Sequence, residues 1–242
     1  MKQRILNNKI FKYLSVLTFW IVVWQVIYII IKNDNLIASP YSVFMCFLRF
    51  ILDFNFWSTI CSSIIRICSG FFMAVVLGTI FGVLTARFYA VNLFFKPIIL
   101  IIKSIPIVSL IILVTSFINL IFVPTFISFI TVLPVIFNNV YQGITYSKSN
   151  STDYGKNNFS FIFPYIISAI SSGIGFAWKS GISAEVLVKI GASVGEEVYK
   201  AKANLLITEL FTWTVVIVVF CFLLEKIIIL SLNFFINQKY VK

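Results

Sequence analysis

The sequence predicts an all-α polytopic membrane protein, and two observations lead to this fold class: its composition and the length of its apolar runs. Of the 242 residues, 60% are hydrophobic and only 11% are charged. A soluble domain carries roughly 25% charged residues. The mean hydropathy of +1.03 lies far on the apolar side. We therefore expect one membrane-spanning domain that occupies residues 1–242.

Six apolar runs are long enough to cross a bilayer, since about 20 helical residues span a hydrocarbon core of about 30 Å. The first run follows several basic residues and is too long for the apolar core of a signal peptide, so we expect it to stay as an anchor. The expected spans are residues 11–31, 59–86, 94–117, 120–142, 161–182 and 207–233.

Residues 33–58 differ from these runs. Their apolar side chains have helical spacing, but Arg49 and Asp53 interrupt them. This pattern predicts an amphipathic helix that lies at the membrane interface and does not cross it.

The distribution of Lys and Arg predicts the orientation of the spans. Basic residues occur in the amino terminus, in residues 87–96, in residues 143–160 and in the carboxyl-terminal tail. Six spans place all four segments on the same side, and basic connections favour the cytoplasm. We therefore expect both termini in the cytoplasm, and we interpret the net charge of +11 as a signal of topology.

The sequence contains no recognisable catalytic constellation. It has no His, no phosphate-binding loop of Walker type, and no nucleophile paired with a base. The four Cys show no CxxC spacing and fit small core residues. We expect no enzyme activity, no metal site and no cofactor bound by this chain.

Charged residues inside spans are expensive and often functional. For Arg66, early in the second span, two interpretations stay open: its side chain reaches the outer interface, or it faces a cavity. Lys103 lies too deep for that reach, so we expect it inside the bundle. Glu185 lies near an outer helix end, where an interface position and a pathway position are both open. The candidate pathway residues are Arg66, Lys103, Ser104, Pro106, Trp178 and Glu185.

Small residues and prolines punctuate the spans. Gly78 and Gly82 form a small-xxx-small pair and, together with Gly70, predict close packing of helices. Pro106, Pro124 and Pro134 are expected to break or bend helices, which is common where helices line a transport pathway. Such bends do not by themselves establish a pathway.

The order of several sequence blocks resembles one family. The blocks are "ASPYSV", "FWSTICSSIIRICSGFFMAVVLGTIFGVL", "FFKPIILIIKSIPIVSLIIL", "FNNVYQGI", "AWKSGISAEVL" and "GASVGEEVYKAKANLLITELF". Together they resemble ABC-importer permeases of the nitrate/sulfonate/taurine type, which also includes thiamine-precursor permeases. The resemblance covers roughly residues 15–232, and its specific parts are Ser63 to Phe71 and Ala177 to Glu185.

This resemblance implies a fold like that of type I ABC-importer permeases and a bacterial inner-membrane location. It implies a dimer, either homodimer or heterodimer, that pairs with a cytoplasmic ATPase and an extracytoplasmic solute-binding protein. ATP and Mg would bind to the ATPase and not to this chain. The implied cargo is a small organic solute or anion, and a basic pathway with Arg66 and Lys103 would suit an anion.

The family carries an ATPase-coupling loop with an E-A-A motif between its fourth and fifth spans. Here Asp153, Tyr154, Gly155 and Lys156 occupy that position, E-A-A is absent, and the segment from Gly143 to Pro164 is short for the family. Asn and Gly are poor helix formers, which argues against a stable coupling helix. Three explanations stay open: a shorter coupling element, the weaker half of a heterodimer, or a permease that no longer transports.

Three functions therefore compete. The first is an importer permease, and the second is a membrane scaffold or regulatory subunit with weakened coupling to an ATPase. The third is a secondary transporter, which predicts inverted repeats and carboxylates deep in spans. The sequence shows no such repeats, and we expect no carboxylate deep in a span.

Overall fold

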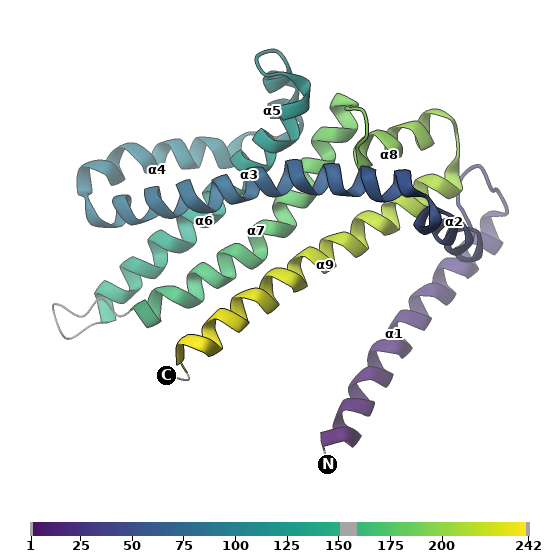
Figure 1. Ribbon diagram of the computed structural model, residues 1–242, viewed down its shortest axis with the longest axis horizontal. Coiled ribbons are helices and arrows are strands. Elements are labelled where there is room, and N and C mark those ends of the chain that lie inside the picture. The colour runs from purple at the N-terminus through teal and green to yellow at the C-terminus, as the bar shows by residue number, and fades with distance from the viewer. Residues whose placement is uncertain (1, 151–158, 241–242) are drawn as a thin grey trace. The chain divides into compact units, whose positions relative to one another are not determined.

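The computed structural model describes residues 2–150 and 159–240, and this part of the chain is helical without any strand. Figure 1 shows the arrangement of the helices. Their bounds are α1 Lys2–Ile31, α2 Pro40–Leu52, α3 Phe54–Arg87, α4 Tyr89–Ser104, α5 Ile107–Thr115, the 3-10 helix η1 Leu120–Phe122, α6 Val123–Asn150, α7 Phe159–Val188, α8 Val194–Ala203 and α9 Ile207–Tyr240. The expectation of an all-α protein is confirmed for these residues.

Four helices in the described residues are long and apolar enough to cross a membrane: α1, α3, α6 and α9. A fifth span results if the bent pair of α4 and α5 counts as one. Helix α7 corresponds to the fifth expected span but does not belong to this apolar set. Its Ser and Gly residues are small and suit a helix packed between others.

The chain divides into two compact units, the first made of residues 1–57 and 198–216. In this unit the indole Nε1 of Trp24 donates a hydrogen bond of 3.1 Å to the carbonyl of Ala38. The Phe50 ring lies 5.2 Å from the ring of Trp213, and the Phe56 ring lies 5.4 Å from it, centroid to centroid. These aromatic contacts hold α2 and the start of α3 against the first turns of α9.

Helix α2 forms where the sequence predicts an interfacial helix, but it is shorter than residues 33–58. Ser39 caps its start by accepting from the backbone N–H of Ser42, and Pro40 supplies a fixed φ at the first helical position. Asp53 ends α2 in an extended conformation. Its carboxylate then accepts from the N–H of Asn55, which opens α3. The second expected span therefore begins as a helix at Phe54 and not at residue 59.

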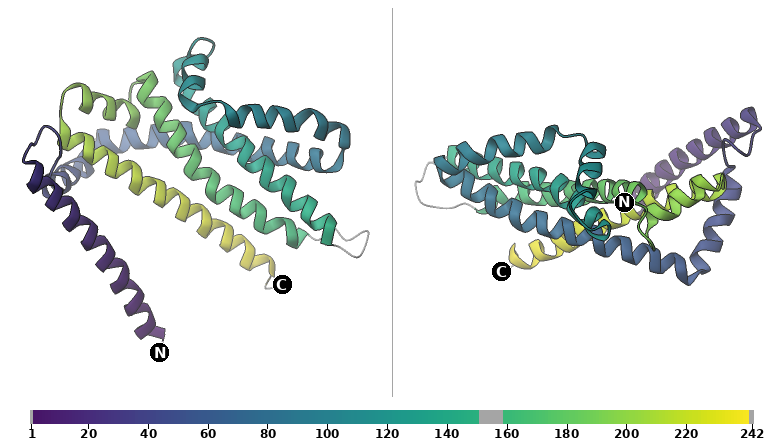
Figure 2. Two further views of the ribbon diagram at one scale, coloured as in Figure 1. Left: turned by 180° about the vertical axis from the view of Figure 1, so that it is seen from behind. Right: turned by 90° about the horizontal axis from the view of Figure 1, so that it is seen from above.

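The second unit contains residues 58–197 and 217–242. Figures 1 and 2 show α6 and α7 side by side along most of their length. Helix α3 packs against α6 through small residues. A Cβ atom added to Gly70 would lie 2.1 Å from the Thr125 carbonyl oxygen, and one added to Gly78 would lie 2.9 Å from Ile136 Cβ. A Cβ atom added to Gly82 would likewise lie 3.0 Å from Val140 Cβ.

Pro106 separates α4 from α5, which meet at 98°. The residue before a proline is pushed out of the helical region, and Ile105 has φ −76° and ψ 125°. The expectation of a bend at Pro106 is confirmed, and the expected span 94–117 is not one straight helix. Pro134 lies inside α6, which continues through it, and Pro124 lies in the first turn of α6.

Large apolar side chains remain exposed on several helices. In α1 none of the residues from Leu14 to Ile31 is buried. Exposed Phe, Ile and Leu side chains also line α4 and α9. Contiguous apolar surface of this kind suits contact with lipid or with another membrane helix.

Candidate functional site

The carboxylate of Glu185 is the centre of a polar cluster inside the second unit. Glu185, in the last turns of α7, has 0% exposure. Ser63 Oγ donates a 2.8 Å hydrogen bond to Glu185 Oε2, and the backbone N–H of Gly195 donates to the same oxygen at 3.2 Å. Arg66 Nε lies 3.4 Å from Oε1 as an ion pair. We call Ser63, Arg66, Glu185 and Gly195 the Glu185 cluster.

Helix α3 supplies the cationic part of the cluster. Ser62, Ser63 and Arg66 lie on one side of α3 because residues three and four apart are neighbours on a helix. Arg66 Nη2 donates to Ser62 Oγ at 3.1 Å and to the carbonyl of Ala192 at 2.9 Å. Ser62 Oγ also bonds to the Ala192 carbonyl. The guanidinium therefore links α3 both to α7 and to the turn after it.

The turn between α7 and α8 places that carbonyl. Lys189 and Ala192 have φ of 55° and 53°, in the left-handed region that costs an L-residue of order 1–2 kcal/mol. Two left-handed residues reverse the chain within a few positions, and Ser193 then caps α8. Ser193 Oγ accepts from the N–H of Glu196 at 3.1 Å and donates to the carbonyl of Ile190 at 2.7 Å.

Gly195 brings the first turn of α8 against the backbone of α7. A Cβ atom at this position would lie 2.3 Å from Glu185 Cβ and 2.4 Å from the backbone nitrogen of Val186, so only glycine fits. The neighbouring N–H of Val194 donates to Ser63 Oγ at 2.9 Å. The start of α8 thus contributes two backbone donors to the cluster.

The geometry suits an anchor between helices and does not suit catalysis. The Ser63 hydroxyl donates to Glu185 and accepts from Val194, so it is not poised as a nucleophile. A buried ion pair that keeps its hydrogen bonds fixes one arrangement of the elements that it joins. In residues 2–150 and 159–240, no group of three His, Cys, Asp or Glu side chains could hold a metal ion.

The structure settles the positions of the three charged candidates. Arg66 has 17% exposure and turns toward Glu185 and Ala192. Glu185 is buried inside the protein. The depth of both residues in the membrane, at its interface or in a pathway, stays a prediction. Lys103 is exposed near the break between α4 and α5, as are Ser104 and Pro106. The expectation that Lys103 lies inside the bundle is wrong for this chain, because α4 ends at Ser104.

Trp178, a further candidate, is buried and joins two helices. Its Nε1–H donates a 2.9 Å hydrogen bond to the carbonyl of Ile217 in α9. The indole therefore fixes the level at which α7 and α9 meet. Trp178 also lines a groove between these helices, and its place in a pathway stays a prediction.

This groove, the α7–α9 groove, has a volume of about 430 Å³. It is lined by Ser172, Gly175, Phe176, Trp178, Lys179, Ile217, Val218, Cys221, Phe222 and Glu225. Glu225 lies within the apolar span Ile207–Leu232. The expectation of no carboxylate deep in a span is therefore wrong for this residue.

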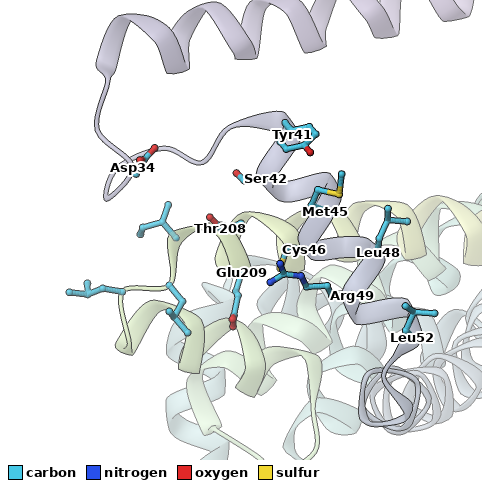
Figure 3. A pocket seen from close by; sticks show the side chains of 13 residues that line it. Asp34, Tyr41, Ser42, Met45, Cys46, Leu48, Arg49, Leu52, Thr208 and Glu209 are labelled. Atoms are coloured by element: carbon cyan, nitrogen blue, oxygen red, sulfur yellow. The ribbon is translucent and has the colours of Figure 1, made fainter.

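A larger hollow of about 850 Å³ occurs in the first unit. Figure 3 shows Arg49 of α2 and Glu209 of α9 directed into the space between these helices, with Leu48 and Leu52 along the α2 side. Arg49 lies in the last turn of α2 and Glu209 in the first turn of α9. Each charge is thus placed favourably relative to its own helix dipole, which accounts for both without a ligand.

The residues expected to contact an ATPase, Asp153, Tyr154, Gly155 and Lys156, lie outside the described residues. Their function stays a prediction from the sequence. The flanking helices are described as far as Asn150 in α6 and from Phe159 in α7.

No protein-family model and no curated protein matches this sequence. The sequence blocks and the positions of their residues in the fold are therefore the observations that bear on function.

Sequence reasoning missed several members of these sites. Ser62, Ala192 and Gly195 join the Glu185 cluster, and the signal was present in the "CSSIIR" and "GASVGEE" segments around them. Glu225 was also missed: it lines the α7–α9 groove with Lys179 of the "AWKSGISAE" segment, 46 positions earlier in the sequence (225 minus 179). Only the pairing of α7 with α9 brings this second pair together.

Proposed function

We propose that this chain is a permease subunit of an ABC importer, which forms the membrane pathway for a small organic solute or anion. The observation that carries this proposal is the convergence of three sequence blocks that resemble the family. Ser63 and Arg66 come from the "SSIIRICSGFF" block, Glu185 from "AWKSGISAE" and Gly195 from "GASVGEE", and all four meet in one cluster. A resemblance based on chance composition would not be expected to place its blocks in contact.

The proposed topology has six spans, formed by α1, α3, the pair α4–α5, α6, α7 and α9. An even number of spans agrees with the basic segments on one side, which puts both termini in the cytoplasm. The exposed apolar surfaces are suited to lipid and to a second permease, with which the chain would form a dimer. A separate cytoplasmic ATPase would bind ATP and Mg, and an extracytoplasmic binding protein would deliver the solute. The chain itself would be neither an enzyme nor a metal protein.

The charge of the transported solute is less directly supported. The anion hypothesis relied on Arg66 and Lys103, but Arg66 is paired with Glu185 and Lys103 is exposed beside the α4–α5 break. These positions weaken the case for a purely anionic pathway. A sulfonate-, taurine- or nitrate-like solute and a thiamine-precursor-like solute both remain within the proposal.

A second function is a membrane scaffold or regulatory permease homologue with weakened ATPase coupling. One sequence observation favours it: the segment expected to carry the E-A-A motif lacks that motif and is short for the family. Of the three explanations for this loop, a shorter working element and a heterodimer partner both preserve transport.

The deciding experiment is purification of the tagged chain from its native cell in mild detergent, combined with crosslinking from Tyr154→Cys after replacement of the four native cysteines. Co-purification of an ATPase that crosslinks at position 154 would support the importer proposal. A second permease with a complete loop in the same complex would identify this chain as half of a heterodimer. A folded, abundant chain without any ATPase would reject the importer proposal in favour of the scaffold.

A cysteine at position 12 serves as the matched control, because Lys12 belongs to the amino-terminal segment expected on the same side of the membrane. Crosslinking from position 12 with equal efficiency would show random collision, and the contact at position 154 would then carry no weight.

A further inference from the structure

We propose that the α7–α9 groove binds an extended solute with a positive group at one end and a negative group at the other. The inference rests on the proposed function only for its role in transport, since binding can be measured on this chain alone. It assigns the negative group of the solute to Lys179 and the positive group to Glu225.

The two charges lie on opposite walls of the groove, Lys179 on α7 and Glu225 on α9. Among the described side chains, neither Lys179 Nζ nor the Glu225 carboxylate is within hydrogen-bond or ion-pair distance of a partner. Charges in membrane helices almost always face a bundle interior or a water-filled cavity, pair with one another or with backbone carbonyls, and mark the pathways of substrates or ions. Two unpaired opposite charges that share one cavity therefore indicate a complementary dipolar ligand.

The paired state of Arg66 strengthens this choice of site. Arg66 has the Glu185 carboxylate at 3.4 Å from its Nε and donates from Nη2 to the Ala192 carbonyl at 2.9 Å, so its charge is paired inside the protein although Nε makes no hydrogen bond. Lys103 is exposed beside the α4–α5 break and does not itself line a described cavity, although Ile102 and Ile105 line an apolar one. Among the charged residues of the expected spans, Lys179 and Glu225 alone are both unpaired and assigned to one cavity in the described structure.

The length of the ligand follows from the register of the two helices. The hydrogen bond from Trp178 to the carbonyl of Ile217 sets these residues at the same level. Glu225 is eight residues further along α9, a rise of about 12 Å. The side chains of Lys179 and Glu225 cover part of this separation, and a solute with a charge at each end of a short chain would bridge the rest.

The walls and the volume fit such a molecule. The exposed rings of Phe176 and Phe222 line the groove between the charges, and the Trp178 indole closes its inner side. A volume of about 430 Å³ is within the range of about 300–1,000 Å³ that is typical of small-molecule sites. An apolar methylene chain would contact the rings while its ends meet Lys179 and Glu225.

Cys221 gives a direct readout because it lines the same groove and is half-buried. The full chain, with its other three cysteines replaced by Ser, is placed in lipid nanodiscs and labelled with N-ethylmaleimide. The probe is 6-aminohexanoate, and hexanoate and hexylamine are its singly charged analogues. At about ten times its Kd, 6-aminohexanoate should slow labelling about tenfold, and each analogue should protect far less at equal concentration.

The variants Lys179→Gln and Glu225→Gln should each abolish the protection, while Lys103→Gln and Glu209→Gln remove the same charges elsewhere and should preserve it. Circular dichroism and gel filtration verify folding. If either single variant misfolds, the reversed pair Lys179→Glu/Glu225→Lys replaces it, and this pair should still bind the probe in the opposite direction.

Three results would overturn the assignment: no labelling of Cys221 in the free protein, no protection by 6-aminohexanoate, or equal protection by the singly charged analogues. Protection of a chain that retains only the exposed Cys61 would show a general effect of the probe and would also overturn it. An ATPase crosslink from position 154 without protection at Cys221 leaves the importer proposal intact and removes only this site. Protection without an ATPase partner would keep the site and reject the importer.

Discussion

Replacement of Glu185 by Ala should destabilise the second unit more than any other single charge removal in the described chain. The substitution removes the acceptor of Ser63 Oγ and of the Gly195 N–H, and it leaves Arg66 without its carboxylate. Each buried donor left without a partner costs about 1–3 kcal/mol. Breaking a buried ion pair by removing one partner costs about 3–5 kcal/mol in all.

The lower end of this range is appropriate here. Arg66 is 17% exposed and keeps its hydrogen bonds to Ala192 and Ser62, so solvent and these bonds offset part of the loss. We expect a loss of about 3 kcal/mol, or about 6–12 °C in Tm at about 2–4 °C per kcal/mol for a chain of this size. Glu185→Gln keeps the shape and one acceptor and should cost roughly half as much.

The assay is thermal unfolding of the purified chain in one detergent, followed by near-ultraviolet circular dichroism. Lys103→Ala is the matched control, because it removes an exposed charge and should cost about 0.5 kcal/mol or less, which is at most about 1–2 °C in Tm. The double variant Arg66→Met/Glu185→Met should be less destabilised than the sum of the two single variants. Equal Tm values for Glu185→Ala and Lys103→Ala would refute the anchoring role of the cluster.

Three further predictions test the packing and the exposure of other positions. Gly70→Ala should lower the free energy of unfolding by about 1–3 kcal/mol, because the added Cβ would lie 2.1 Å from a carbonyl oxygen of α6. The control Gly175→Ala has its nearest neighbour 4.0 Å away and should leave Tm unchanged or higher. Equal losses for the two variants would contradict the close approach of α3 and α6. Trp178→Phe should lower the free energy of unfolding by about 1 kcal/mol, since it leaves the Ile217 carbonyl without its indole donor. An unchanged Tm in thermal unfolding would mean that this hydrogen bond does not fix the two helices. Burial raises the pKa of the Cys46 thiol above its ordinary value, so the fraction of reactive thiolate is small at neutral pH. Maleimide labelling of a chain that retains only Cys46 should therefore accelerate at a pH above the ordinary thiol range. A labelling rate that rises with its midpoint below that range would contradict this prediction.

The general fold was predictable because composition and apolar length act locally. An apolar run of about 20 residues must be helical in a bilayer, whatever its neighbours are. Pro106 likewise acts on its own neighbours, and the break between α4 and α5 follows from the missing N–H and from the extended Ile105. Helix ends were less predictable: α3 begins at Phe54 because Asp53 caps it, a signal outside the apolar run.

The candidate site was predictable only in part. Arg66 and Glu185 were recognisable individually, because charges in apolar segments are unusual, but their pairing joins positions far apart in the chain. The wrong expectation for Lys103 has a related cause. Its depth was counted along one straight span, whereas the 98° bend ends α4 one residue after it.

The contacts of helix α7 were likewise not predictable from the sequence. Its apolar length was enough to expect a span at residues 161–182, but not to tell which helices it contacts. Its position becomes clear only from its neighbours, because Gly181 leaves no room for a Cβ beside Ile67 of α3 and Ser128 of α6.

The Glu185 cluster also constrains how this sequence can change over evolutionary time. Loss of Glu185 alone leaves the Arg66 cation without its carboxylate, and loss of Arg66 alone leaves a buried carboxylate without its cation. Any side chain at position 195 would collide with the backbone beside Glu185. Stepwise drift through such intermediates is disfavoured, so related chains should either retain Ser63, Arg66, Glu185 and Gly195 together or replace them as a set. A lineage that exchanges the ion pair for two apolar residues should therefore also show a changed turn between α7 and α8, since the Ala192 carbonyl would lose its guanidinium partner.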